Sequence, residues 1–108
     1  MKNHEEKARD YKKQGNNCSK SINMAFIEDC EISNDYPAPR SIDGKCGALL
    51  ASLKILKETG HEEKIEEFEK EFIKRFGYAT CVDLMRKDRR CNDYVGECAR
   101  LLDEIINN

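Results

Sequence analysis

The chain of 108 residues has no tryptophan, only two prolines and no long apolar segment. A helix needs roughly 18 or more mostly apolar residues to span a bilayer, so the sequence predicts no membrane partner. Residues 2–7 are polar or charged, and no apolar segment follows them. We therefore expect no secretory signal and a cytoplasmic location.

A strong charge of either sign is also absent. The 19 basic and 21 acidic residues give a net charge of −2. Proteins that bind nucleic acid usually present a basic face, and the nearest candidate here is a short run from Arg86 to Arg90 that Asp88 interrupts. The composition therefore argues against a nucleic-acid partner.

The six cysteines include no Cys-x-x-Cys pair. Common zinc modules and bacterial ferredoxins rely on such closely spaced ligands, so the spacing alone names no cofactor. In a reducing cytoplasm, cysteines are more often metal ligands, catalytic thiols or buried small side chains than disulfides.

What the sequence does contain is helical periodicity. Gly15, Gly60 and Gly77 separate the periodic segments, and glycine commonly ends a helix in the left-handed conformation. The pattern predicts helices over residues 2–14, from Cys18 to about Cys30 or Ile32, from about residue 43 to 58, over 62–76, over 81–87, and from about Cys91 to Ile106. No strand pattern, repeat or domain boundary is present, so we expect residues 1–108 to form one all-α domain, a small bundle of five or six helices.

Apolar faces indicate which side of each helix meets the core. The clearest period lies in residues 62–76, whose inner face holds Ile65, Phe68, Phe72 and Phe76, with Ile73 beside them. On the outer face, Glu66 with Lys70 and Glu71 with Arg75 have the spacing of favourable ion pairs. The buried face of the last helix would hold Tyr94, Val95, Cys98, Leu101, Leu102 and Ile105.

Four cysteines, Cys18, Cys46, Cys81 and Cys91, fall in the first turn of predicted helices. A helix N-terminus carries partial positive charge and N–H donors, so it stabilises a thiolate, the species that binds metals and attacks disulfides. Four such helix ends at one end of a bundle would form a shared, electropositive thiolate pocket. Basic side chains beside these cysteines would favour the anionic form further.

Cys46 is the centre of this prediction. Gly44 and Gly47 flank it, and they would let the backbone turn sharply and let another group approach closely. Lys45 adds positive charge, and Asp43 is expected to cap the helix rather than to accept a proton. The simpler alternative is that the cysteines only pack, because cysteine is among the most buried residue types.

Cys30 and Cys98 are interpreted as packing residues. Cys30 lies near the end of its predicted helix and lacks the favourable helix dipole, whereas Cys98 follows Cys91 by seven residues on a core face. We assign no role to His4, which lies in the polar N-terminal segment.

The sequence also resembles a known family. Residues 15–18 (Gly-Asn-Asn-Cys), residues 46–51 (Cys-Gly-Ala-Leu-Leu-Ala), Cys81 and Cys91 resemble the four-cysteine proteins named for the pattern C_GCAxxG_C_C, which are regarded as redox-active. The resemblance runs from Gly15 through the last helix and implies a small helical protein with redox-active or cofactor-binding cysteines. Ala51 stands where the family pattern has its last glycine, and the segment between Cys18 and Cys46 is shorter than expected.

These observations leave three functions open. The four cysteines could hold an iron–sulfur cluster or, second in preference, a zinc ion, and serve an unidentified redox partner. Without a metal, Cys46 and Cys18 could be catalytic thiols that cycle between dithiol and disulfide. The third alternative is a structural or interaction bundle, and the sequence decides neither whether the protein is an enzyme nor whether it forms a homodimer.

Overall fold

The structure is a computed structural model that describes residues 3–27, 30, 32–36, 44–80, 83–84 and 91–106, with side chains from residue 94 onward in the last range. Its helices are α1 (His4–Lys13), α2 (Cys18–Ile27), α3 (Gly47–Glu58), the 3-10 turn η1 (Glu62–Lys64), α4 (Ile65–Phe76) and α6 (Cys91–Ile106). The described ranges contain no strand, only an isolated bridge between Lys45 and Thr80. The predicted all-α bundle is confirmed.

Side-chain caps and glycines set the ends of the first two helices. The Asn3 side chain accepts a hydrogen bond from the Glu6 amide at 2.8 Å, and Gly15 follows α1 with a φ of 100°. At the start of α2, the Asn17 side chain accepts from the Lys20 amide at 2.7 Å, so Asn17 is the cap. The helical residues of α2 run from Cys18 to Ile27, and Cys30 lies in a bend, although its amide still donates to the Phe26 carbonyl at 2.9 Å, the spacing of a helical hydrogen bond. The predicted end near Cys30 therefore agrees to within a few residues, and an extension to Ile32 is wrong.

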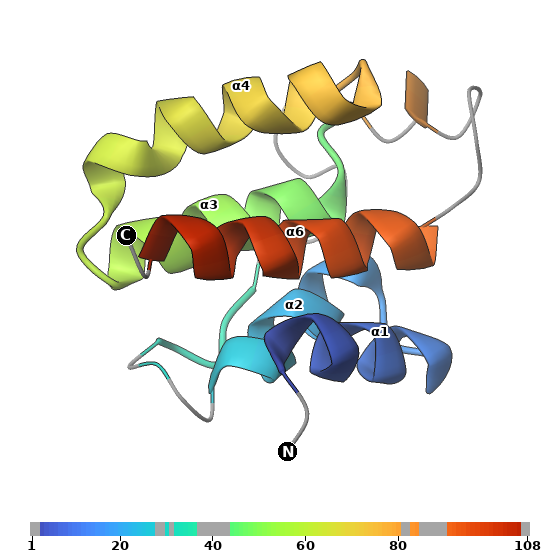
Figure 1. Cartoon of the computed structure of the whole chain (residues 1–108). Helices are drawn as coiled ribbons and strands as arrows, with labels where there is room; N and C mark the ends of the chain where they lie inside the picture. Colours follow the sequence, from blue (N-terminus) through green and yellow to red (C-terminus); the bar gives the residue numbers. More distant parts are fainter. Residues whose placement is uncertain are drawn as a thin grey trace.

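The helices form three layers. Figure 1 shows α3 and α6 in the middle layer, with α4 on one side and α1 and α2 on the other, and α2 packs directly against α3. The largest completely buried side chains come from α2, α3, α4, α6 and residue 84, namely Ile22, Phe26, Leu49, Ile55, Leu56, Phe68, Phe72, Leu84, Val95 and Leu102. Burying side chains of this size stabilises the fold by about 1.5–3 kcal/mol each.

Helix α4 lies on the outside of the bundle and buries a narrow face. Phe68 and Phe72 are completely buried, as predicted, but Ile73 is 41% exposed, so its expected place on the inner face is wrong. Outer ion pairs join Lys70 to Glu66 at 3.2 Å and Arg75 to Glu71 at 3.1 Å, which confirms the predicted spacing. Gly77 ends the helix with a φ of 90°.

Helices α2, α3 and α6 begin at the same end of the bundle, on the right in Figure 1, and α4 ends there. The prediction that the third helix begins at about residue 43, with Asp43 as its cap, is wrong: α3 begins at Gly47, Cys46 is its N-cap, and residues 44–46 are not helical. Most of the short helix predicted over 81–87 lies outside the described residues, although residues 83–84 are helical. None of the described helices is both long enough and apolar enough to cross a membrane.

Candidate thiol site

Cys46 occupies the N-cap position of α3, directly before Gly47. Its carbonyl accepts the first helical hydrogen bond, from the Leu50 amide at 3.0 Å, while its own amide donates to the carbonyl of Ala79 at 2.9 Å. The adjacent bridge between Lys45 and Thr80 continues this pairing. The start of α3 is therefore fixed against the segment that ends one residue before Cys81 in the sequence.

Gly44 allows the turn that leads into Cys46. Its φ is 69°, in the left-handed region that favours glycine. No described atom lies within 4 Å of a Cβ placed on Gly44. The expected sharp turn is confirmed, and at Gly44 the reason for glycine is backbone conformation rather than the close approach of another group.

The structure places two of the four predicted site thiols. Cys46 is 4% exposed, and Cys18, the first residue of α2, is partly buried against the same core cluster. The backbone of Cys91 stands at the first residue of α6, but its side chain and all of Cys81 lie outside the described residues. The meeting of all four thiols stays a prediction.

Cys98 lies closer to this group than the sequence interpretation suggested. Burial raises the pKa of the Cys98 thiol well above its ordinary value, the charges of Cys46 and Cys18 raise this pKa further, and a hydrogen bond with Ser52 opposes the rise. Cys98 packs as predicted, at 1% exposure, but it also lies within electrostatic reach of two site thiols. Its position seven residues after Cys91, on one face of α6, is the sequence signal for this placement.

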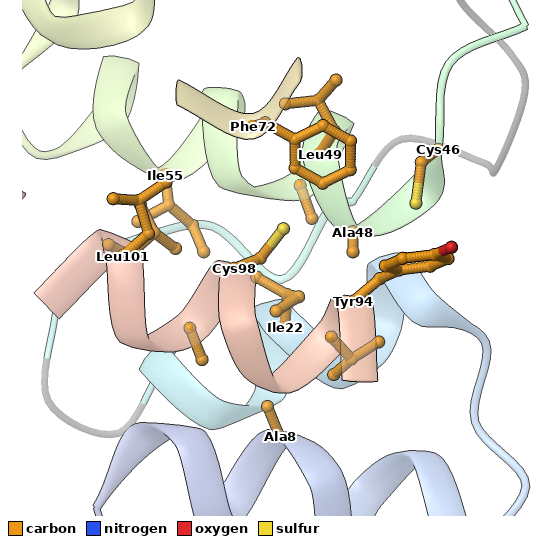
Figure 2. Packing of buried hydrophobic residues seen from close by; sticks show 14 of the residues in the cluster. Ala8, Ile22, Cys46, Ala48, Leu49, Ile55, Phe72, Tyr94, Cys98 and Leu101 are labelled. Carbon is orange, nitrogen blue, oxygen red and sulfur yellow. The ribbon is translucent and has the colours of Figure 1, made fainter. Parts of the chain in front are cut away.

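Apolar and aromatic side chains surround these thiols. Figure 2 shows Cys46, Cys98, Tyr94 and Phe72 in one part of the core, with the sulfur of Cys98 directed toward α3. The ring of Phe76 contacts Phe72 edge-on at 4.7 Å between centroids and Tyr94 edge-on at 4.9 Å. Aromatic walls of this kind keep water away from the thiols.

Two expectations about individual residues need correction. Lys45 does not act on Cys46 alone, because its ammonium group bonds the Glu69 carboxylate at 2.7 Å and its charge is shared with that group. His4 has contacts that the sequence did not indicate: its ring stacks on Phe26 at 4.2 Å between centroids, and its Nδ1 lies 2.6 Å from Asp103 Oδ1. Both contacts join helices distant in the sequence, so no local pattern shows them.

The remaining candidates lie within the packed core or at its margin. Ala51, which replaces a glycine of the family pattern, is completely buried in α3. Cys30 is partly buried against the core cluster, in a bend rather than at a helix start. Both positions suit packing.

Thiolates are ligands that suit zinc and iron–sulfur clusters. Among the residues whose side chains are described, no three Cys, His, Asp or Glu residues are grouped so that they could hold a metal ion. The predicted four-thiol metal site also includes Cys81 and Cys91, whose side chains lie outside this set.

No family model, no curated protein and no solved structure matches this chain.

Proposed function

We propose that the protein is redox-active and that Cys18, Cys46, Cys81 and Cys91 act as one site at the end of the bundle where α2, α3 and α6 begin. The observation that carries the proposal is the common direction of these three helices (Figure 1), together with the hydrogen bond from the Cys46 amide to the Ala79 carbonyl. The resemblance to the four-cysteine redox family supports the same set of residues.

The local environment suits thiol chemistry. Cys18 is the first residue of α2 and Cys46 is the N-cap of α3, and the partial positive charge of a helix N-terminus favours a thiolate. The apolar surroundings of Cys46 limit the approach of water, so hydrogen bonds to a thiolate there are stronger than in solvent. Burial raises the pKa of the Cys98 thiol well above its ordinary value and so favours its neutral form.

Two kinds of chemistry fit this set of thiols. In the first, the four thiolates would hold an iron–sulfur cluster, which would supply one-electron transfer, or a zinc ion, which would be structural because zinc has no redox chemistry. In the second, the thiolate of Cys46 attacks a disulfide of the redox partner and forms a mixed disulfide, and Cys18 then attacks Cys46. This exchange leaves a Cys18–Cys46 disulfide and two thiols on the partner, so two electrons and two protons have moved to the partner.

Purification without oxygen separates the two chemistries. Bound iron with visible charge-transfer absorption, or stoichiometric zinc, would support the metal site. Metal-free protein that loses two titratable thiols on mild oxidation and regains them with a reductant would support thiol exchange. Metal-free protein whose thiol count does not respond to oxidant would leave the structural or interaction bundle.

Serine variants test which residues belong to the site. For a metal site, replacement of any one of Cys18, Cys46, Cys81 and Cys91 should abolish metal binding, whereas for thiol exchange only replacement of Cys18 or Cys46 should abolish reversible oxidation. Cys30→Ser is the matched control, because Cys30 is partly buried against the same core but lies in a bend away from a helix start. Equal effects in all five variants would contradict the proposed residue set.

A further inference from the structure

The segment from η1 through α4 covers the part of the core that contains Cys46 and Cys98. Cys46 is 4% exposed and Cys98 is 1% exposed, so neither sulfur can meet a second protein in the closed structure. Glycines with left-handed backbone conformations bound the covering segment, with a φ of 81° at Gly60 and of 90° at Gly77. These glycines mark the two points where the segment joins the rest of the chain.

Aromatic rings fill the space between α4 and the thiols. Phe72 projects from α4 into the core cluster that includes Cys46 and Cys98, as Figure 2 shows. Phe76, at the end of α4, contacts the ring of Tyr94 on α6. Displacement of α4 would therefore remove the apolar cover from the side of the core where both thiols lie.

Ion pairs attach α4 to Lys45 and to α6. Lys45, the residue before Cys46, bonds Glu69 of α4 at 2.7 Å. Arg75 of α4 lies 3.5 Å from Glu97 and 3.8 Å from Glu104, both on α6. All of these side chains are partly exposed, so salt weakens the attachments.

We propose that residues 62–76 form a lid whose opening controls access to Cys46 and Cys98. The buried faces of Phe68 and Phe72 keep the closed state dominant, since opening exposes their rings to water. The ion pairs set how often the lid opens. This regulation concerns the thiols of the proposed function and rests on it for its biological meaning, but the lid itself can be measured without any redox activity.

The test is the rate at which iodoacetamide alkylates Cys46 in the reduced, folded protein, followed by peptide mass spectrometry. Glu69→Gln removes the attachment beside Cys46, and exposed ion pairs of this kind affect an equilibrium by about two- to five-fold, so we expect alkylation to accelerate by that factor. Glu66→Gln is the matched control, because Glu66 pairs with Lys70 within α4 and should leave the rate unchanged.

A second pair of variants tests the attachment to α6. Arg75→Gln should also accelerate alkylation of Cys46, whereas Lys70→Gln should not. Raising the salt concentration should accelerate alkylation of the wild type more than that of Glu69→Gln, because the variant has already lost one screened attachment.

Hydrogen exchange distinguishes lid opening from unfolding of the whole domain. We expect Glu69→Gln to accelerate exchange in residues 62–76 while α1 and α6 keep wild-type protection. Equal alkylation rates in Glu69→Gln and Glu66→Gln, or parallel acceleration of exchange in α6, would overturn the lid. A protein with no metal and no reversible oxidation would overturn the proposed function and leave these rates unaffected.

Discussion

At the scale of single residues, Cys98 shows how burial raises the pKa of a thiol. The side chain lies between α3 and α6 at 1% exposure, and burial is the largest of the effects that raise its pKa. An ionised Cys98 would be a buried charge beside a single hydroxyl, that of Ser52, which donates its proton to the Ala48 carbonyl at 2.7 Å. Cys98 therefore stays a neutral thiol over the range in which an exposed thiol ionises.

This shift predicts a loss of stability at high pH. Because the pKa of Cys98 is higher in the folded than in the unfolded state, its contribution is complete below the ordinary value of 9.0 and is lost as pH rises toward the folded pKa. Urea denaturation should show that the free energy of unfolding falls more between pH 7 and pH 10 in the wild type than in Cys98→Ala. At pH 7 the free energy of unfolding of the alanine variant should be lower than that of the wild type by about 1 kcal/mol, because the buried sulfur is missing. Parallel falls in both proteins would contradict the assignment.

Glycine at position 96 of α6 is explained by the packing of a neighbouring side chain. A Cβ placed there would overlap the guanidinium group of Arg9. Arg9 also bonds Glu5 of its own helix at 3.0 Å. Glycine at position 96 therefore accommodates a side chain of α1.

A double-mutant cycle tests this contact. In an Arg9→Ala background, Gly96→Ala should stabilise the protein by about 1 kcal/mol, because alanine is the better helix former. In the wild type the same change should gain less or should destabilise, since Arg9 must move. Thermal denaturation of the four proteins gives the coupling, and equal effects of Gly96→Ala in both backgrounds would contradict it.

At the scale of elements, a polar network holds residues 32–36 against α2 and α3. Lys54 of α3 donates to the Asn23 side chain at 2.6 Å, to the Ser33 carbonyl at 2.9 Å and to the Asp35 carbonyl. Glu58 accepts hydrogen bonds from the amide of Ser33 at 3.0 Å and from its hydroxyl at 2.9 Å. These bonds satisfy backbone groups of a segment that forms no regular structure.

The network predicts an acid-sensitive contribution from Glu58. Burial acts to raise the pKa of its carboxyl, but the hydrogen bonds from Ser33 and the charge of Lys54 outweigh burial and lower it. A lowered pKa means that stability is present above the ordinary value of 4.5 and is lost as pH falls through the folded pKa. Urea denaturation should show that the free energy of unfolding decreases less between pH 7 and pH 3 in Glu58→Gln than in the wild type. The control variant Glu66→Gln should behave like the wild type. A decrease in Glu58→Gln as large as that in the wild type would contradict this role of Glu58.

The sequence could predict those helices whose limits depend on local patterns. Helices α4 and α6 follow from strong apolar periodicity and, for α4, from Gly77, and their predicted ends agree with the structure. The arrangement of residues 32–36 after α2 could not be predicted, because Lys54 and Glu58, which bond Ser33, lie more than 20 residues away from it in the sequence. The exposure of Ile73 was not predicted for a related reason. The neighbouring helices cover only a narrow face of α4, and the width of that buried face depends on how those helices pack.

In the candidate site, too, the sequence predicted features that depend on local signals and missed those that depend on contacts between segments. The helix start at Cys18 was predictable, since Asn17 is a local signal, whereas the start of α3 was predicted at about residue 43, four residues before Gly47. The pairing of residue 45 with residue 80, the ion pair between Lys45 and Glu69, and the nearness of Cys98 to Cys46 were not predictable. Each depends on how two helices or segments lie against each other, which residue spacing within one segment does not encode.

At the scale of the whole molecule, helix direction explains how distant cysteines can share one end of the bundle. Connections at Gly15 and Gly60 reverse the chain, so α1 and α4 run opposite to α2 and α3 (Figure 1). α6 runs in the same direction as α2 and α3, and its first residue is Cys91. Three helices thus begin with, or are capped by, a cysteine at the end where α4 stops.

The most direct test of the central claim is the pattern of disulfides that forms when reduced, metal-free protein is oxidised by glutathione disulfide. Each pair of protein thiols that joins reduces one glutathione disulfide to two thiols, and peptide mass spectrometry identifies the pair. The proposed site predicts intramolecular pairs drawn from Cys18, Cys46, Cys81 and Cys91 in protein that keeps its helical circular dichroism. Pairs that contain Cys30 or Cys98, or glutathione attached to single cysteines without any internal pair, would contradict the shared site.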